Sequence, residues 1–136
     1  MSNLFRISAR DHGALILMTT LAEANVGEGF VSLQEIAEQM RLSQGYLEEI
    51  AALLKKAGLI QGKQGPNGGY RLAKDPKAIT LEAILTALEG PVELVDCQSA
   101  SVACPVSSKC ASKNVWKIVQ RNLQKTLRET TLAETI

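Results

Sequence analysis

The chain's three cysteines, Cys97, Cys104 and Cys110, lie within 14 consecutive residues of a segment rich in serine and alanine. An odd number of thiols cannot all form disulfides within one chain. Thiols so close together on a loop are more typical of ligands to a metal centre than of structural cross-links. Nucleophilic catalysis is poorly supported, because it needs a base beside the thiol and His12 is the only imidazole in the chain. We therefore do not expect an enzyme.

The spacing of the thiols, C-x6-C-x5-C, bears on what they hold. Zinc sites usually pair ligands about two to four residues apart, whereas an iron–sulfur cluster is larger than one ion and tolerates wider gaps. The spacing favours a cluster, either 2Fe-2S or 4Fe-4S. A zinc site and a cofactor-free thiol sensor stay open as alternatives.

Composition limits the remaining possibilities. The 136 residues are 46% hydrophobic, which is enough for one packed domain or slightly more. No apolar run approaches the roughly 20 residues that span a membrane, and the N-terminus does not have the pattern of a signal peptide. These observations predict a cytoplasmic protein without a membrane partner.

Positive charge is concentrated in one part of the chain. Residues 41–77 contain seven basic and three acidic residues, a net charge of +4, although the whole chain carries only +1. A local basic excess of this kind is typical of a surface that contacts nucleic acid.

Helical periodicity and capping residues predict three helices in the first 58 residues. The first begins after Ser8 and keeps an apolar stripe until Asn25; the second begins at Ser32, with Glu35 completing a capping box. After the short break "RLS", Ser43 caps a third helix that Gly58 ends. Two helices joined by so short a turn are typical of a helix-turn-helix.

A β-hairpin follows, with strands "LIQGK" and "YRLAK" around the turn "QGPNGG". A helix-turn-helix followed by a hairpin predicts a winged helix. We expect Lys63 at the base of the wing with Arg71 across from it, and glycines that allow close approach to a phosphate.

Beyond the wing, residues 80–90 predict another helix, capped by Thr80. The cysteine segment follows, and then a long helix capped by Asn114. The apolar stripe Val115, Val119, Leu123 and Leu127 needs a covering surface, and a second copy of the chain could supply it. The predicted fold is thus mainly α with a small β-hairpin wing. We divide it into a winged-helix domain (1–90), a cysteine loop (91–113) and a dimerisation helix with its tail (114–136).

The segment "SQGYLEEI", followed by "GPNGGYRL" and then clustered cysteines, closely resembles the IscR and NsrR family of bacterial regulators. The resemblance covers nearly the whole chain. It implies a homodimeric winged-helix transcription factor that binds a pseudo-palindromic operator in double-stranded DNA, and many members hold an iron–sulfur cluster.

The resemblance also implies a ligand set. Cys97, Cys104 and Cys110 match the family's three cluster ligands, with one extra residue in the first gap. The position of the fourth ligand in IscR-like members is Lys113 here. In NsrR-like members that ligand comes from the start of the partner's first helix, which corresponds to His12, with Asp11 as second choice.

Sequence and resemblance together predict regulation of DNA binding by a cluster that senses iron–sulfur status, redox state or nitric oxide. The alternatives are a zinc-stabilised or thiol-based regulator and a metal-stabilised interaction module. Tyr46 could equally belong to the core. The candidate DNA contacts lie at the start of the third helix (Ser43, Gln44, Tyr46, Glu48, Glu49) and in the wing (Lys63, Gln64, Asn67, Gly68, Gly69).

Overall fold

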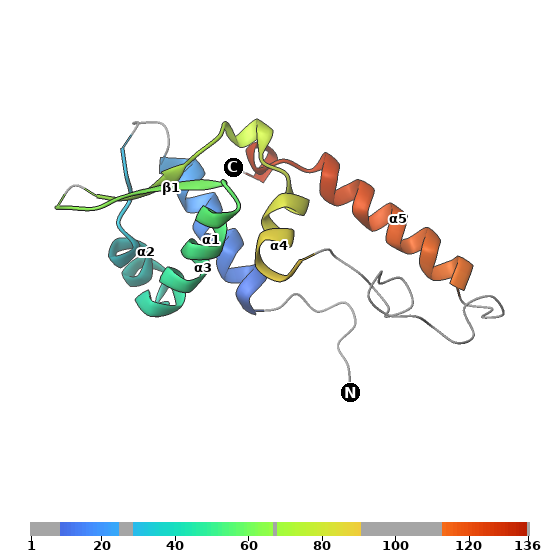
Figure 1. Ribbon diagram of the computed structural model, residues 1–136, viewed down its shortest axis with the longest axis horizontal. Coiled ribbons are helices and arrows are strands. Elements are labelled where there is room, and N and C mark those ends of the chain that lie inside the picture. The colour runs from blue at the N-terminus through green and yellow to red at the C-terminus, as the bar shows by residue number, and fades with distance from the viewer. Residues whose placement is uncertain (1–8, 25–28, 67, 91–112, 136) are drawn as a thin grey trace.

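The computed structural model describes residues 9–24, 29–66, 68–90 and 113–135, and the side chain of residue 113 is not described (Figure 1). It is mainly helical with one two-stranded antiparallel hairpin, as the sequence predicts. The elements in chain order are α1 (Ala9–Ala24), α2 (Leu33–Met40), α3 (Gln44–Lys56), β1 (Ile60–Lys63), β2 (Gly69–Leu72), η2 (Pro76–Ala78), α4 (Leu81–Glu89), α5 (Lys113–Glu129) and η4 (Leu132–Thr135).

The helix-turn-helix of α2 and α3 forms because serines begin both helices. The Ser32 hydroxyl accepts from the backbone N–H of Gln34 at 3.1 Å, and the Ser43 hydroxyl accepts from that of Tyr46 at 3.3 Å. Between the helices Arg41 takes the left-handed conformation (φ 54°), and the N–H of Leu42 donates to the Ala37 carbonyl at 2.9 Å. The predicted turn is confirmed.

The wing is attached to the helices by a third extended segment, which the sequence did not reveal. Val31 and Tyr70 exchange two backbone hydrogen bonds of 2.8 Å each. Gly69, beside this bridge, has φ +141°, and a Cβ there would lie 2.2 Å from the Val31 carbonyl oxygen. Only glycine allows the two backbones to approach so closely.

The hairpin register differs from our expectation in two respects, because Lys63 lies at the turn end of β1 and not at the base of the wing. Lys63 pairs with Gly69, and Arg71 pairs with Gln61, so Arg71 is not directly across from Lys63. The reason is that β1 ends at Lys63, next to the turn, whereas Arg71 lies two residues farther along β2.

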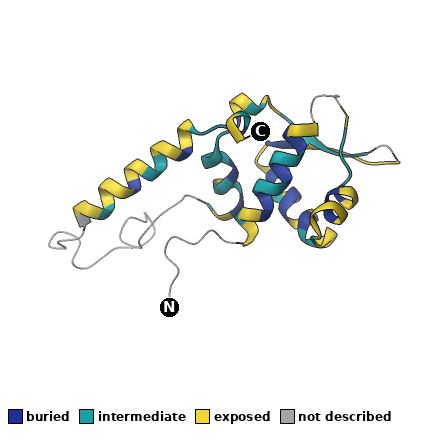
Figure 2. Cartoon of the chain, turned by 180° about the vertical axis from the view of Figure 1, so that it is seen from behind, coloured by how far each residue is buried: buried dark blue, intermediate teal, exposed yellow. Residues whose placement is uncertain are grey.

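The core is centred on α1, which packs against both α3 and α4. Leu17, Met18 and Leu21 of α1 are 0–1% exposed, in agreement with the predicted apolar stripe. Figure 2 shows that buried positions (dark blue) gather along the helices in the middle of the body. A Cβ on Gly13 would lie 2.9 Å from Ile50 Cδ1 and 3.0 Å from Tyr46 Cε2, so the start of α1 is pressed directly against α3.

The C-terminal residues return to this core, although the sequence indicated no element after the last long helix. The N–H of Leu132 donates to the Ile79 carbonyl at 2.8 Å, and the Leu132 side chain is completely buried. The N–H of Leu81 donates to the Thr130 carbonyl at 3.0 Å. The C-terminal end of α5, which we call its root, is therefore fixed to the winged helix.

The long helix α5 packs against α4 at its C-terminal end and extends away from the body on the side opposite the wing (Figure 1). Asn114 lies inside α5, so its prediction as the cap is wrong. Along the apolar stripe Leu127 is 8% exposed, but Val115, Ile118 and Val119 are 56%, 55% and 37% exposed. Within the described part of the chain, no helix is long and apolar enough to cross a membrane.

Candidate nucleic-acid interface

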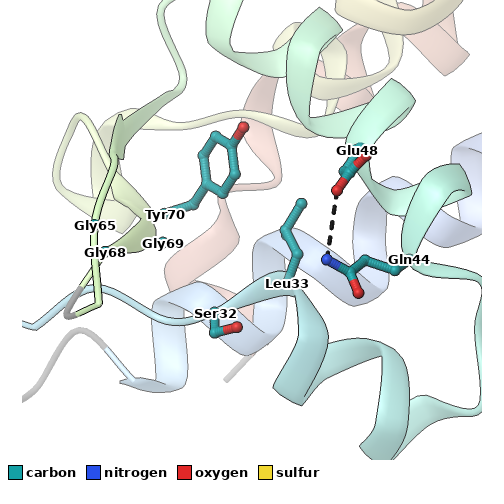
Figure 3. Close-up of a pocket in the computed structure, with 8 residues that line it drawn as sticks. All are labelled: Ser32, Leu33, Gln44, Glu48, Gly65, Gly68, Gly69 and Tyr70. Atoms are coloured by element: carbon teal, nitrogen blue, oxygen red, sulfur yellow. Dashed lines mark hydrogen bonds between the residues drawn. The ribbon is translucent and has the colours of Figure 1, made fainter.

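An open groove of about 430 Å³ separates the start of α3 from the wing (Figure 3). The Ser32–Leu33 step and the first turns of α3 form one wall, and the glycines and Tyr70 of the hairpin form the other. The lining residues are Ser32, Leu33, Gln44, Glu48, Gly65, Gly68, Gly69 and Tyr70. The groove contains four of the predicted contacts, which come from two segments well separated in sequence.

The exposed face of α3 begins with polar side chains. Gln44, Glu48 and Glu49 are all exposed. Gln44 Nε2 donates to Glu48 Oε1 at 3.4 Å, a long bond between solvent-exposed groups (Figure 3). The bond orients the Gln44 amide along the helix, and its length makes it weak enough to exchange for another partner. Ser43 is also exposed, but its hydroxyl is already used as the cap of α3.

Tyr46 faces the other way. Its ring lies against Gly13 of α1, and its hydroxyl oxygen is buried without a hydrogen-bond partner among the described residues. The structure thus favours the packing role for Tyr46, which the sequence left open, over contact with a ligand in the groove.

The wing carries cations and tight turns. Lys63 and Gln64 are exposed, while Asn67 lies outside the described residues. A Cβ on Gly68 would lie 2.2 Å from the Lys63 carbonyl oxygen, and the N–H of Gly68 donates to the Gly65 carbonyl at 2.9 Å. Gly68 and Gly69 are therefore required by the hairpin itself, whatever the wing contacts.

Two residues at the wing were missed by the sequence interpretation. The Phe30 ring lies under both Lys63 and Arg71, with 5.6 Å from Lys63 Nζ and 4.7 Å from Arg71 Cζ to the ring centroid. Gln61 Oε1 accepts from Arg71 Nε at 3.2 Å. The only sequence signal for Phe30 was an aromatic residue next to the β-branched Val31, because its partners lie more than thirty positions away.

The basic excess of residues 41–77 is not neutralised by ion pairs. Among the described residues the one salt bridge joins Arg128 Nε to Glu82 Oε2 at 2.9 Å, at the root of α5. No described carboxylate therefore pairs with Lys63 or Arg71. Uncompensated cations beside a groove and an exposed helix start form a surface suited to a polyanion.

The proposed metal ligands are mostly outside the described residues, and this applies to all three cysteines. His12 is exposed on the first turn of α1, whereas Asp11 beside it is half-buried with its Oδ1 shielded from solvent. Across the described ranges, no group of three His, Cys, Asp or Glu side chains could hold a metal ion.

Comparison with known proteins agrees with this geometry. Residues 7–136 match the family model Rrf2, described as an iron-dependent transcriptional regulator. The chain is 31% identical over 131 residues to the HTH-type transcriptional regulator IscR of Yersinia pseudotuberculosis, covering 96% of this chain and 79% of that protein.

Solved structures give the same result. IscR of T. potens has a TM-score of 0.77 at 35% identity, covering 96% of this chain and 85% of that one. CymR, the global cysteine regulator of B. subtilis, has a TM-score of 0.78 at 33% identity, with 96% and 95% covered. An oxidized form of CymR from Staphylococcus aureus has a TM-score of 0.73 at 34% identity, with 94% and 93% covered. The chain belongs to the Rrf2 family of winged-helix, DNA-binding transcriptional regulators.

Proposed function

We propose that this chain is a cytoplasmic, homodimeric transcriptional regulator whose binding to a pseudo-palindromic operator is controlled by an iron–sulfur cluster. The observation that carries the proposal is the joint presence of a DNA-binding winged helix and three clustered cysteines in a family described as iron-dependent. The cluster ligands are Cys97, Cys104 and Cys110, with His12 as the fourth.

DNA recognition divides between α3 and the wing. The start of α3 enters the major groove, where the amide of Gln44 can read an adenine edge and a carboxylate of Glu48 or Glu49 can accept from a cytosine amino group. The wing, through Lys63, Gln64 and the turn at 67–69, contacts the adjacent backbone or minor groove. The open groove between the two walls separates the base-reading and backbone-contacting surfaces.

The donor set fits a cluster chemically. Three thiolates with one imidazole is a ligand combination suited to iron–sulfur centres. When bound, the cluster supplies a group whose oxidation or loss changes the charge and ligation of the cysteine segment. His12 is better placed than Asp11 to serve a partner subunit, because its side chain is exposed on α1.

The first turn of α1 is also in a position to affect DNA binding. Gly13, the residue after His12, lies against Tyr46 and Ile50 of α3. Because this contact is close-packed, a displacement of the start of α1 acts directly on the first turns of the recognition helix. A change in ligation at His12 could therefore reach α3 through the contact that the next residue, Gly13, makes with it.

The exposed stripe of α5 supports the homodimer. One face of α5 leaves three neighbouring apolar side chains exposed, those of Val115, Ile118 and Val119. In a two-fold symmetric dimer the same stripe on the α5 helix of each copy would cover that of the other.

A second candidate is a thiol-based regulator without a cluster. It is favoured by the similarity to the global cysteine regulator CymR, including a structure of an oxidized form. In this alternative the cysteines respond by reversible oxidation, and the winged helix keeps the same DNA contacts.

The division of roles on DNA can be tested by substitution. Lys63→Gln should weaken binding to all duplexes about equally and lower the salt slope by about 0.9, because one phosphate contact is lost. Gln44→Ala should instead change the preference between operator and mixed-sequence duplexes, as measured by fluorescence anisotropy. A uniform loss of affinity for Gln44→Ala would show that Gln44 reads no base.

The cofactor can be tested on anaerobically purified protein. We expect a brown sample with iron and acid-labile sulfide, and loss of both in Cys104→Ala. Circular dichroism should show the same helical content in the variant. Stoichiometric zinc without sulfide would contradict the cluster, and metal-free protein with oxidant-dependent DNA binding would favour the thiol-based alternative.

The fourth ligand is tested by His12→Ala, which should retain the fold but give a cluster with an altered visible spectrum and a shorter lifetime in air. Asp11→Asn is the matched control on the same turn and should leave both unchanged. The reverse pattern would assign the carboxylate as ligand. If neither variant changes the spectrum, the cross-subunit part of the proposal is wrong.

The dimer is tested by Ile118→Asp. Ile118 is exposed in the single chain, so the change should leave the monomer folded. In the dimer the carboxylate would be buried without a partner, which should cost about 3 kcal/mol of dimer stability. We expect a monomer by sedimentation. The control Lys117→Asp, on the opposite face of α5, should stay dimeric. If Ile118→Asp also stays dimeric, the dimer interface does not include this face of α5.

A further inference from the structure

The outer face of the wing sheet is built from three segments. Val31 bridges Tyr70, so the antiparallel register places Phe30 beside Arg71, and Gln61 pairs with Arg71 from the other strand. Lys63 lies two residues after Gln61, on the same face. The opposite face carries Ile60 and Leu72, which are buried in the core.

On this outer face the Phe30 ring contacts both cations. The Arg71 guanidinium carbon and the Lys63 ammonium lie 4.7 Å and 5.6 Å from the centroid of its ring. A cation over an aromatic face is attracted by the ring quadrupole. Both cations therefore contact one and the same ring.

One nitrogen of the Arg71 guanidinium is hydrogen-bonded, and the other two still have N–H groups that can donate to a ligand. Its Nε donates to Gln61 Oε1 at 3.2 Å, which leaves the N–H groups of its two terminal nitrogens without an acceptor in the described ranges. The single described salt bridge lies at Arg128, so neither Lys63 nor Arg71 has a carboxylate partner there. Planar terminal N–H groups beside an ammonium match the oxygens of a phosphodiester.

We propose that Phe30 is a positioning residue that holds Lys63 and Arg71 together as a two-cation clamp for the DNA backbone. The clamp contacts phosphate oxygens and carries no sequence information of its own. The inference rests on DNA binding by the winged helix and is independent of the cluster and of the base contacts from α3.

The test uses the full-length protein and a fluorescein-labelled mixed-sequence duplex of about 30 base pairs, a length that exceeds two helical turns. Binding is measured by anisotropy over a range of KCl concentrations. Phe30→Leu should weaken binding about threefold to tenfold, since it removes two cation–π contacts but keeps an apolar side chain. Phe30→Tyr keeps the ring and should stay within about twofold of the unsubstituted protein.

The decisive comparison is made in a background that lacks both cations. Lys63→Gln with Arg71→Gln should lower the salt slope by about 1.8, the value for two phosphate contacts. Adding Phe30→Leu to that pair should have no further effect if Phe30 acts only through them. Lys77→Gln, an exposed lysine of η2, is the matched control; in its background Phe30→Leu should keep its full effect.

Several results would overturn the clamp. One is a Phe30→Leu protein that binds like the original, and another is an equal loss with and without the two cations. A loss for Phe30→Tyr as large as for Phe30→Leu would also count against it. Phe30→Met is the second ring-free variant, and unfolding of both would show that the ring's role is structural. If the unsubstituted protein does not bind the duplex, the DNA-binding function itself fails, which is distinguishable from failure of the clamp.

Discussion

Two hydrogen bonds between Val31 and Tyr70 relate the two parts of the candidate DNA-binding surface to each other. They fix the hairpin to the residue that immediately precedes the cap of α2, and so relate the wing to the helix-turn-helix. The approach is possible only because Gly69 has no side chain next to the Val31 carbonyl. The groove, the wing cations and the Phe30 ring all take their positions from this one backbone pair.

Local patterns in the sequence were sufficient for most of the fold. Ser32, Ser43 and Thr80 begin helices as predicted, because a side-chain oxygen that satisfies the first free N–H groups is a local requirement. The buried face of α1 was equally readable, because its apolar residues recur three and four positions apart. These features depend on residues three or four positions apart.

Features that depend on distant residues could not be predicted in this way. The Val31 bridge, the contact of Tyr46 with Gly13 and the cations over Phe30 each join segments that carry no mark of one another. The tail after α5 was missed because four residues in a 3-10 helix are too short for a periodic signal, although Leu132 proves to be fully buried. The candidate DNA contacts on α3 and the wing stay a prediction, although four of them line one groove.

Because α5 is attached to the body at its C-terminal end, a small rotation there moves its far end by a larger distance. Its root is fixed to the body by Leu132, by the Thr130 carbonyl and by the Arg128–Glu82 pair, while its far end at residue 113 connects to the cysteine segment. Seventeen helical residues span roughly 25 Å, so a rotation of about 5° at the root corresponds to a movement of about 2 Å at the tip. A small displacement at residue 113 therefore acts over the whole length of α5 on the contacts that fix its C-terminal end beside α4.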